Sequence, residues 1–257
     1  VALASRGVPI AFITGRSDTF MREEVVAPLL RAGLPDRIRM FGVSEKGGVW
    51  FPITGGGMGE ITVDSELALP EDYTAEFREL AENRFSDAMF FDDTKHAMIS
   101  LEQNRETSPE DYRIAQAQVN QEAFDLLVEY GLGARYGDQE FPDADGLVNF
   151  RVDPTIISTD VESVLSDKDR GAARALDYFR ETGELPTLWR TVGDSRSDYL
   201  VHTVGFMLSD GPRFVSLAQE VLPDGDGYRA VTHIPRSIVE RIVPLEFEWA
   251  EAPGETE

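Results

Sequence analysis

The chain has 257 residues, 42% of them hydrophobic and 28% charged, which is typical of a globular protein and not of a disordered one. Its formal net charge of −23 argues against a nucleic-acid backbone or an anionic membrane as a partner. It contains no cysteine, which excludes disulfides, thiolate zinc sites and cysteine nucleophiles.

No stretch approaches the ~20 consecutive apolar residues that span a membrane. The first residues also lack the basic and then apolar pattern of a secretory signal. We therefore expect a cytoplasmic protein without a membrane partner. Abundant acidic residues and few lysines favour a salt-adapted proteome, although a GC-rich genome also replaces Lys by Arg. The sequence indicates no particular oligomeric state.

The N-terminal part of the chain has the pattern strand, helix, strand. The strands are predicted over residues 8–14 and 38–43. Between them, Asp18 is a candidate helix cap, and Pro28 predicts a kink because proline interrupts a helix interior. The apolar face of this helix consists of Met21, Val25 and Leu29.

The middle of the chain differs from both ends. A glycine run over residues 54–60 is predicted to be a hinge, since no Lys-Ser/Thr or helical pattern follows it as in a phosphate loop. Two amphipathic helices follow, one after Pro70 and one capped by Ser108. Strand-like segments lie at 97–103, 147–152 and 155–161. We predict a separate α/β domain here.

The C-terminal part alternates strands, at 187–192, 204–209 and 228–232, with helical stretches. Such alternation is typical of an α/β fold with a doubly wound, mostly parallel sheet. We therefore predict a core domain of residues 1–57 and 163–257, with an inserted α/β cap domain over 58–162. Ligands of such sheets bind beyond the carboxyl ends of the strands.

Three strand ends carry candidate functional residues. Thr14, Gly15 and Arg16 directly follow the first strand, where a hydroxyl and backbone N–H groups can hold phosphate oxygens. Taken alone, Thr-Gly after a strand is usually just a turn.

Lys168 lies in the first turn of a predicted helix, where a cation is unfavourable for the helix dipole. A bound anion would offset this conflict. Pairing with Asp167 or Asp169 is the alternative explanation.

Asp194 and Asp198 follow the strand at 187–192, four residues apart. Two carboxylates at a strand end suit a hard cation such as Mg²⁺. A helix cap followed by a first-turn acid fits the same spacing.

Taken together and in this order, the three segments resemble motifs of the haloacid dehalogenase superfamily. The segment "ITGR" resembles the second motif of the superfamily. The segment "DKDRGAA" resembles its lysine motif, and "GDSRSD" resembles its fourth motif. The segment "SEKGGVW" resembles the E-N-G-G segment of capped sugar-phosphate and phosphoglycolate phosphatases, with Lys46 in place of Asn. The resemblance covers nearly the whole chain and implies a Rossmann-like core with a cap.

The resemblance implies a Mg²⁺-dependent phosphomonoester hydrolase that acts on a small phosphorylated metabolite through a phosphoaspartyl intermediate. Thr14 would bond a phosphoryl oxygen, and Lys168 would steady the nucleophile and the phosphate. Asp194 would bind Mg²⁺ directly, and Asp198 directly or through water. Gly15, Arg16 and Lys46 would contact the substrate, and the cap would select it.

The superfamily's first motif, a strand followed by D-x-D-x-T, has no match that fits the topology. Asp143 and Asp145 fall inside the predicted cap, and Asp92 and Asp93 have the wrong spacing. We expect this motif on a strand upstream of Val1, and without it the chain as given would be inactive.

Three other functions are compatible with parts of the pattern. A catalytically silent binding protein and a phosphomutase would share Thr14, Lys168, Asp194 and Asp198. The "GDS" segment is also found in lipase-like hydrolases, but Ser195 comes late and neither His202 nor His233 follows an Asp by three residues. The three histidines are predicted to be surface or packing residues.

Overall fold

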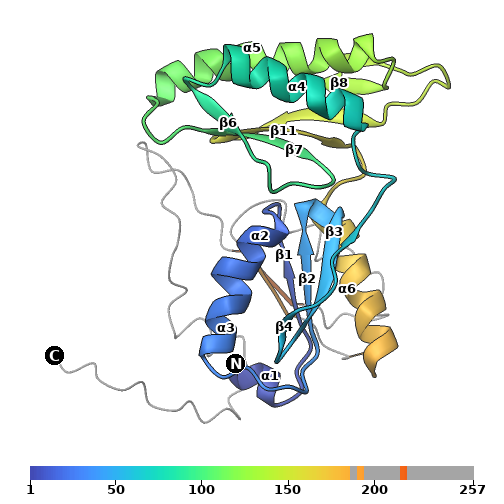
Figure 1. Ribbon diagram of the computed structural model, residues 1–257. Helices are drawn as coiled ribbons and strands as arrows, with labels where there is room; N and C mark the ends of the chain where they lie inside the picture. Colours follow the sequence, from blue (N-terminus) through green and yellow to red (C-terminus); the bar gives the residue numbers. More distant parts are fainter. Residues whose placement is uncertain (186–189, 194–214, 219–257) are drawn as a thin grey trace. The chain divides into compact units, whose positions relative to one another are not determined.

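The structure is a computed structural model that describes residues 1–185, 190–193 and 215–218 (Figure 1). The chain divides into two compact units, Val1–Pro186 and Thr187–Glu257. The second unit contains strands β12 (Arg190–Gly193) and β13 (Val215–Ala218), which pair in parallel. The predicted strands at 204–209 and 228–232 lie outside the described residues.

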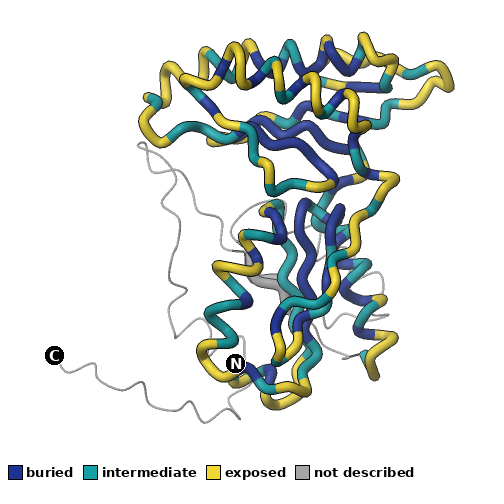
Figure 2. The backbone as a smooth tube through the Cα atoms, in the orientation of Figure 1, coloured by how far each residue is buried: buried dark blue, intermediate teal, exposed yellow. Residues whose placement is uncertain are grey.

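The first sheet of the first unit joins its strands in the order β1-β2-β3-β4, with β5 also paired to β3. Only β1 and β2 are parallel, and every other pair in this sheet is antiparallel. All residues of β2 are buried (Figure 2). The strands are β1 (Ile10–Ile13), β2 (Met40–Ser44), β3 (Val49–Thr54), β4 (Gly57–Met58) and β5 (Thr62–Val63).

The helix that follows β1 is capped by Ser17 and not, as predicted, by Asp18. The Ser17 hydroxyl accepts a 3.3 Å bond from the backbone N–H of Phe20. Serine caps as well as aspartate does, and the buried Asp18 carboxylate is engaged by a distant side chain, His96. The segments are α1 (Ala2–Ser5), α2 (Asp18–Phe20), η1 (Met21–Val26), α3 (Ala27–Arg31), η2 (Glu45–Gly47) and α6 (Lys168–Thr182).

Pro28 is accommodated by a wider helical turn. The segment η1 immediately before it is π-helical, and α3 continues through Pro28 to Arg31. Because proline has no N–H to donate and its ring crowds the preceding turn, a wider turn lets the chain remain helical.

Strand β3 was not predicted from the sequence, because Pro52 lies inside it and proline normally argues against a central strand. On the side away from β2, β5 pairs with Val49 and Trp50, whereas β4 pairs with Ile53 and Thr54. Pro52 therefore falls between the two partner strands, where no ladder N–H is required. The glycine run after β3 begins as the turn between β3 and β4.

The second sheet of the first unit has the order β6-β7-β11-β10-β8-β9, and only the β8–β10 pair is parallel. Helices α4 (Glu71–Arg84) and α5 (Pro109–Glu129) lie side by side on one face of it (Figure 1). The strands are β6 (Met89–Phe91), β7 (Ile99–Gln103), β8 (Ala134–Tyr136), β9 (Gln139–Phe141), β10 (Phe150–Pro154) and β11 (Ser158–Ser163).

Both helices were predicted, since their apolar residues recur with helical spacing. Ser108 caps α5 by accepting a bond from the backbone N–H of Asp111. Tyr73 and Phe77 of α4 and Val119 of α5 are fully buried against the sheet. Tyr130, the residue that follows the last helical residue Glu129, is 37% exposed.

The predicted fold class, an α/β protein, is confirmed, and in the described residues the sheets are mixed, with the parallel pairs β1–β2, β8–β10 and β12–β13. Each sheet of the first unit has its own cluster of buried apolar side chains. The boundaries of the core at 1–57 and 163–257 and of the cap at 58–162 remain predictions.

Candidate functional site

The segments that follow β1 and β2 lie next to each other. The two strands are parallel, with Ile13 in register with Val43, so their carboxyl ends reach the same edge of the sheet. Backbone bonds join the segments directly: the N–H of Lys46 donates to the carbonyl of Thr14 and that of Glu45 to the carbonyl of Arg16, both at 3.0 Å. The Thr14–Arg16 and "SEKGG" segments are thus brought together.

The N-terminus of α6 reaches the same sheet edge. A Cβ atom on Gly171 would lie 2.7 Å from the side chain of Ile13, and one on Gly47 would lie 3.1 Å from the backbone nitrogen of Gly171. Lys168 is the first residue of α6, capped by the Asp167 carboxylate, which accepts the Lys168 N–H at 2.8 Å. Close contact through two glycines therefore brings the predicted Lys168 segment to the ends of β1 and β2.

Asp194 and Asp198, the predicted Mg²⁺ ligands, lie outside the described residues. Strand β12 ends at Gly193, one residue before Asp194. Their role as ligands remains a prediction.

A cavity of about 220 Å³ opens beside Thr14, Gly15 and Arg16. Its other walls come from the second sheet and its loops, and they are mostly polar. They carry three hydroxyls, two carboxylates and one ammonium, with one apolar side chain: Ser100, Thr155, Ser158, Glu102, Asp160, Lys95 and Ile157.

Two polar contacts connect the walls of this cavity. The guanidinium of Arg16 donates to the carboxylate of Glu102 at 3.2 Å. The ammonium of Lys95 donates to the carbonyl of Gly15 at 2.6 Å. Arg16, a predicted substrate contact, thus already has a carboxylate partner that a substrate phosphate would have to displace.

Lys46 lies in a cluster of carboxylates. Its ammonium donates to Glu162 at 2.8 Å and to Asp153 and Asp160 at 3.2 Å. An ammonium has only three N–H donors, so these bonds use all of them. Burial alone would lower the pKa of Lys46, but the three carboxylates, Glu162 foremost, hold it above its ordinary value. Direct contact with a substrate would require Lys46 to exchange one of these partners.

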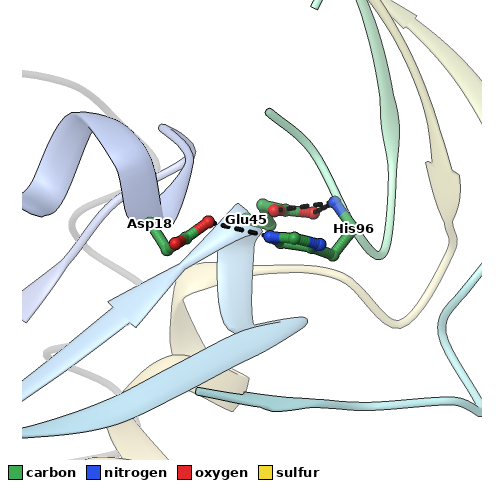
Figure 3. Close-up of side chains that lie close together, drawn as sticks. All are labelled: Asp18, Glu45 and His96. Atoms are coloured by element: carbon green, nitrogen blue, oxygen red, sulfur yellow. Dashed lines mark hydrogen bonds and ion pairs between the residues drawn. The ribbon is translucent and has the colours of Figure 1, made fainter. Parts of the chain in front are cut away.

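Asp18, Glu45 and His96 form a second cluster that the sequence did not indicate (Figure 3). One ligand atom of each lies within 4.8 Å of the others, an arrangement suited to a metal ion. The His96 Nε2 atom is 2.9 Å from an Asp18 carboxylate oxygen. The three residues are far apart in the chain, and the backbone angle φ of 51° at Glu45, which favours glycine, could not be read from the sequence.

Burial raises the pKa of Glu45, although backbone N–H bonds and the nearby Lys95 act in the opposite direction. Its carboxylate accepts bonds from the backbone N–H groups of His96, Ala97 and Met98 at 2.7–3.3 Å. Glu45 therefore fastens the 96–98 segment to the end of β2.

In the part of the chain that the structure describes, no helix is long and apolar enough to cross a membrane. No protein-family model and no curated protein sequence matches the chain.

The chain is similar to several solved structures of phosphatases. Trehalose-6-phosphate phosphatase from Aspergillus fumigatus is 16% identical, with 91% of this chain and 76% of that chain covered and a TM-score of 0.42. Sucrose-phosphatase from Synechocystis is 16% identical, with 83% and 80% covered and a TM-score of 0.38. A haloacid dehalogenase-like hydrolase from Bacillus subtilis is 14% identical, with 78% and 66% covered and a TM-score of 0.35.

Proposed function

We propose that the protein is a Mg²⁺-dependent phosphomonoesterase of the haloacid dehalogenase type that acts on a small phosphorylated metabolite. The observation that carries this proposal is the meeting of Thr14, the Glu45–Gly47 segment and the α6 N-terminus that bears Lys168 at one sheet edge. A polar cavity opens beside Thr14 at this edge.

In the proposed reaction, the chain's own residues hold the phosphoryl group. The Thr14 hydroxyl accepts the backbone N–H of Arg16 at 3.1 Å and can donate its own hydrogen to a phosphoryl oxygen. The α6 N-terminus and the Lys168 ammonium would both favour the anion. Asp194 and Asp198 would hold Mg²⁺, which supplies charge neutralisation when bound. The mechanism also needs an aspartate nucleophile, the residue that the superfamily's first motif would supply.

The cavity lining favours a leaving group rich in hydroxyls. Glu102 and Asp160 accept hydrogen bonds, and three wall hydroxyls both accept and donate them. A carboxylate on the substrate, as in phosphoglycolate, would meet these acids and be repelled. We therefore propose a phosphorylated sugar or polyol as the substrate class.

The test is release of inorganic phosphate by the complete protein with Mg²⁺, from hexose phosphates, polyol phosphates and phosphoglycolate. Thr14→Val should lower kcat by about 10²-fold, as expected for loss of one donor to developing charge. Glu102→Gln should change the ranking of substrates, whereas Glu106→Gln, an exposed acid on the same segment, should not.

Binding of a phosphate ester without release of phosphate would contradict the enzyme assignment and favour the silent binding protein. Transfer of phosphate within the substrate, without release, would favour a phosphomutase. Preference for phosphoglycolate over every sugar phosphate would refute the substrate class alone.

A further inference from the structure

We propose that Asp18, Glu45 and His96 bind a divalent transition-metal ion of the Zn²⁺ class. These residues differ from the predicted Mg²⁺ ligands, Asp194 and Asp198, and the inference does not depend on the proposed function. The ion would fasten the 96–98 segment of the second sheet's β6–β7 connection to the segments that follow β1 and β2 (Figure 3).

The spacing of the donor atoms fits a metal after a small contraction. Ligand atoms on a tetrahedral ion at ~2.1 Å stand ~3.4 Å apart. Here all three donors lie within 4.8 Å of one another, and the Asp18 and His96 atoms are already 2.9 Å apart. The widest pair would therefore have to approach by at most about 1.4 Å, and the Asp18 and His96 atoms would have to separate by about 0.5 Å, to complete the ligand set.

The charge balance of the cluster points to a missing cation. Asp18 and Glu45 are 4% and 1% exposed. Among the described residues, no lysine or arginine lies within 4.0 Å of the Glu45 carboxylate, and the nearby Lys95 ammonium donates to the carbonyl of Gly15 instead. The Asp18 carboxylate has only Arg22, at 3.8 Å on an exposed side chain, besides His96. Two buried carboxylates this close repel each other unless a cation lies between them.

The protein already orients the ligands. The backbone N–H groups of residues 96–98 hold the Glu45 carboxylate, so the segment that supplies His96 also fixes Glu45. Asp18 is held in the first helical position after the Ser17 cap. The His96 side chain is 44% exposed, which gives an ion access from solvent.

The donor types select the class of ion. An imidazole with two carboxylates suits Zn²⁺ and its first-row neighbours, whereas Mg²⁺ and Ca²⁺ prefer oxygen ligands alone. Three protein ligands leave a fourth tetrahedral position for water.

The test is titration of the chelator-treated protein with Zn²⁺ by calorimetry, and with Co²⁺ by visible absorption. We expect a single tight site, with affinity reduced at least about tenfold in both His96→Gln and Asp18→Asn. Asp93→Asn, an exposed acid beside the segment, should bind as the wild type does. Asp194→Asn should also retain the site, which separates it from the predicted Mg²⁺ ligands.

A second measurement covers the case in which the variants fold poorly. The protein has three histidines, so imidazole resonances can be followed in the wild type and assigned with His202→Gln and His233→Gln. One equivalent of Zn²⁺ should shift the His96 resonances. Unchanged His96 resonances, or full affinity in His96→Gln, would overturn the proposal.

Discussion

At the scale of single residues, Lys46 shows how a residue placed by a motif can have a different partner in the fold. The sequence places it beside the phosphate-binding segment, and the backbone bond from Lys46 to Thr14 agrees with that. Its side chain, however, binds Glu162 of β11 and two further acids of the second sheet. Lys46 therefore joins the first sheet's loop to the second sheet.

Removing the Lys46 ammonium should destabilise the protein strongly. Lys46→Met leaves Asp160 without its cation, whereas the fully buried Glu162 keeps the Arg151 guanidinium, 2.7 Å away. Because one of the two cations remains, we expect a cost at the lower end of the range for breaking a buried ion pair, about 3 kcal/mol. The free energy of unfolding, measured by urea titration, should fall by about this amount.

Lys95→Met is the matched control, since the Lys95 ammonium donates to the carbonyl of Gly15 rather than to a buried acid. It should cost no more than one ordinary hydrogen bond, about 1.5 kcal/mol. Equal losses in the two variants would contradict the account of Lys46.

At the scale of elements, α6 is held against the first sheet by a charged contact as well as by the close packing of Gly171 on Ile13. The Asp64 carboxylate, just after β5, accepts bonds from Arg170 at 2.8 Å and from Arg174. Burial by itself raises the pKa of Asp64, but the bond from Arg170 and the charge of Arg174 bring it below its usual 3.8.

This lowered pKa predicts an acid-sensitive helix contact. A carboxyl group whose pKa is lower in the folded than in the unfolded state stabilises the fold fully above its unfolded pKa. That contribution is lost as pH falls from about 3.8 through the folded value. In urea titrations between pH 6 and pH 2.5, the wild type should lose this part of its stability over that window. In Asp64→Asn, the free energy of unfolding should fall less steeply with pH over this window. Equal slopes in the two proteins would contradict the assignment of this pH dependence to Asp64.

The elements could be predicted where their signals are local. Helices α4 and α5 have apolar residues at helical spacing, and α5 also has its Ser108 cap. Strands β1 and β2 are short apolar runs with a polar residue at or just after the end. Strand β3 could not be predicted, because what permits Pro52 there is the gap between two partner strands.

The residues of the candidate site likewise fall into those that the sequence indicates and those that only the fold brings together. Thr14 and Lys168 could be found because strand and helix ends in an α/β fold gather at one edge, which is a rule of topology. The pairing of His96 with Asp18, 78 residues away, and the three acids around Lys46 depend on how the second sheet lies against these loops. No local pattern encodes that placement.

At the scale of the whole molecule, the net charge of −23 sets how the protein responds to salt. Like charges on a compact chain repel one another, and added salt screens this repulsion over ~10 Å at 0.1 M and ~3 Å at 1 M. The thermal midpoint should therefore rise with NaCl and level off near the upper concentration.

Circular dichroism melts over a series of NaCl concentrations would measure this effect. Sucrose at matched osmolality is the control, because it favours burial without screening charge. A thermal midpoint that does not change with NaCl would contradict the prediction that repulsion among the acidic side chains lowers the stability of the fold.

Trp50 of β3 is a fluorescent probe of the contact between β3 and α6. The guanidinium of Arg174 stacks on its indole ring, 3.6 Å from the ring centre, and the Arg174 Nε donates to the carbonyl of Gly47. The chain has only two other tryptophans, Trp189 and Trp249, and replacing both with Phe would leave Trp50 as the sole emitter. Its fluorescence would then report, without an added dye, whether the helix that begins with Lys168 remains seated on the sheet.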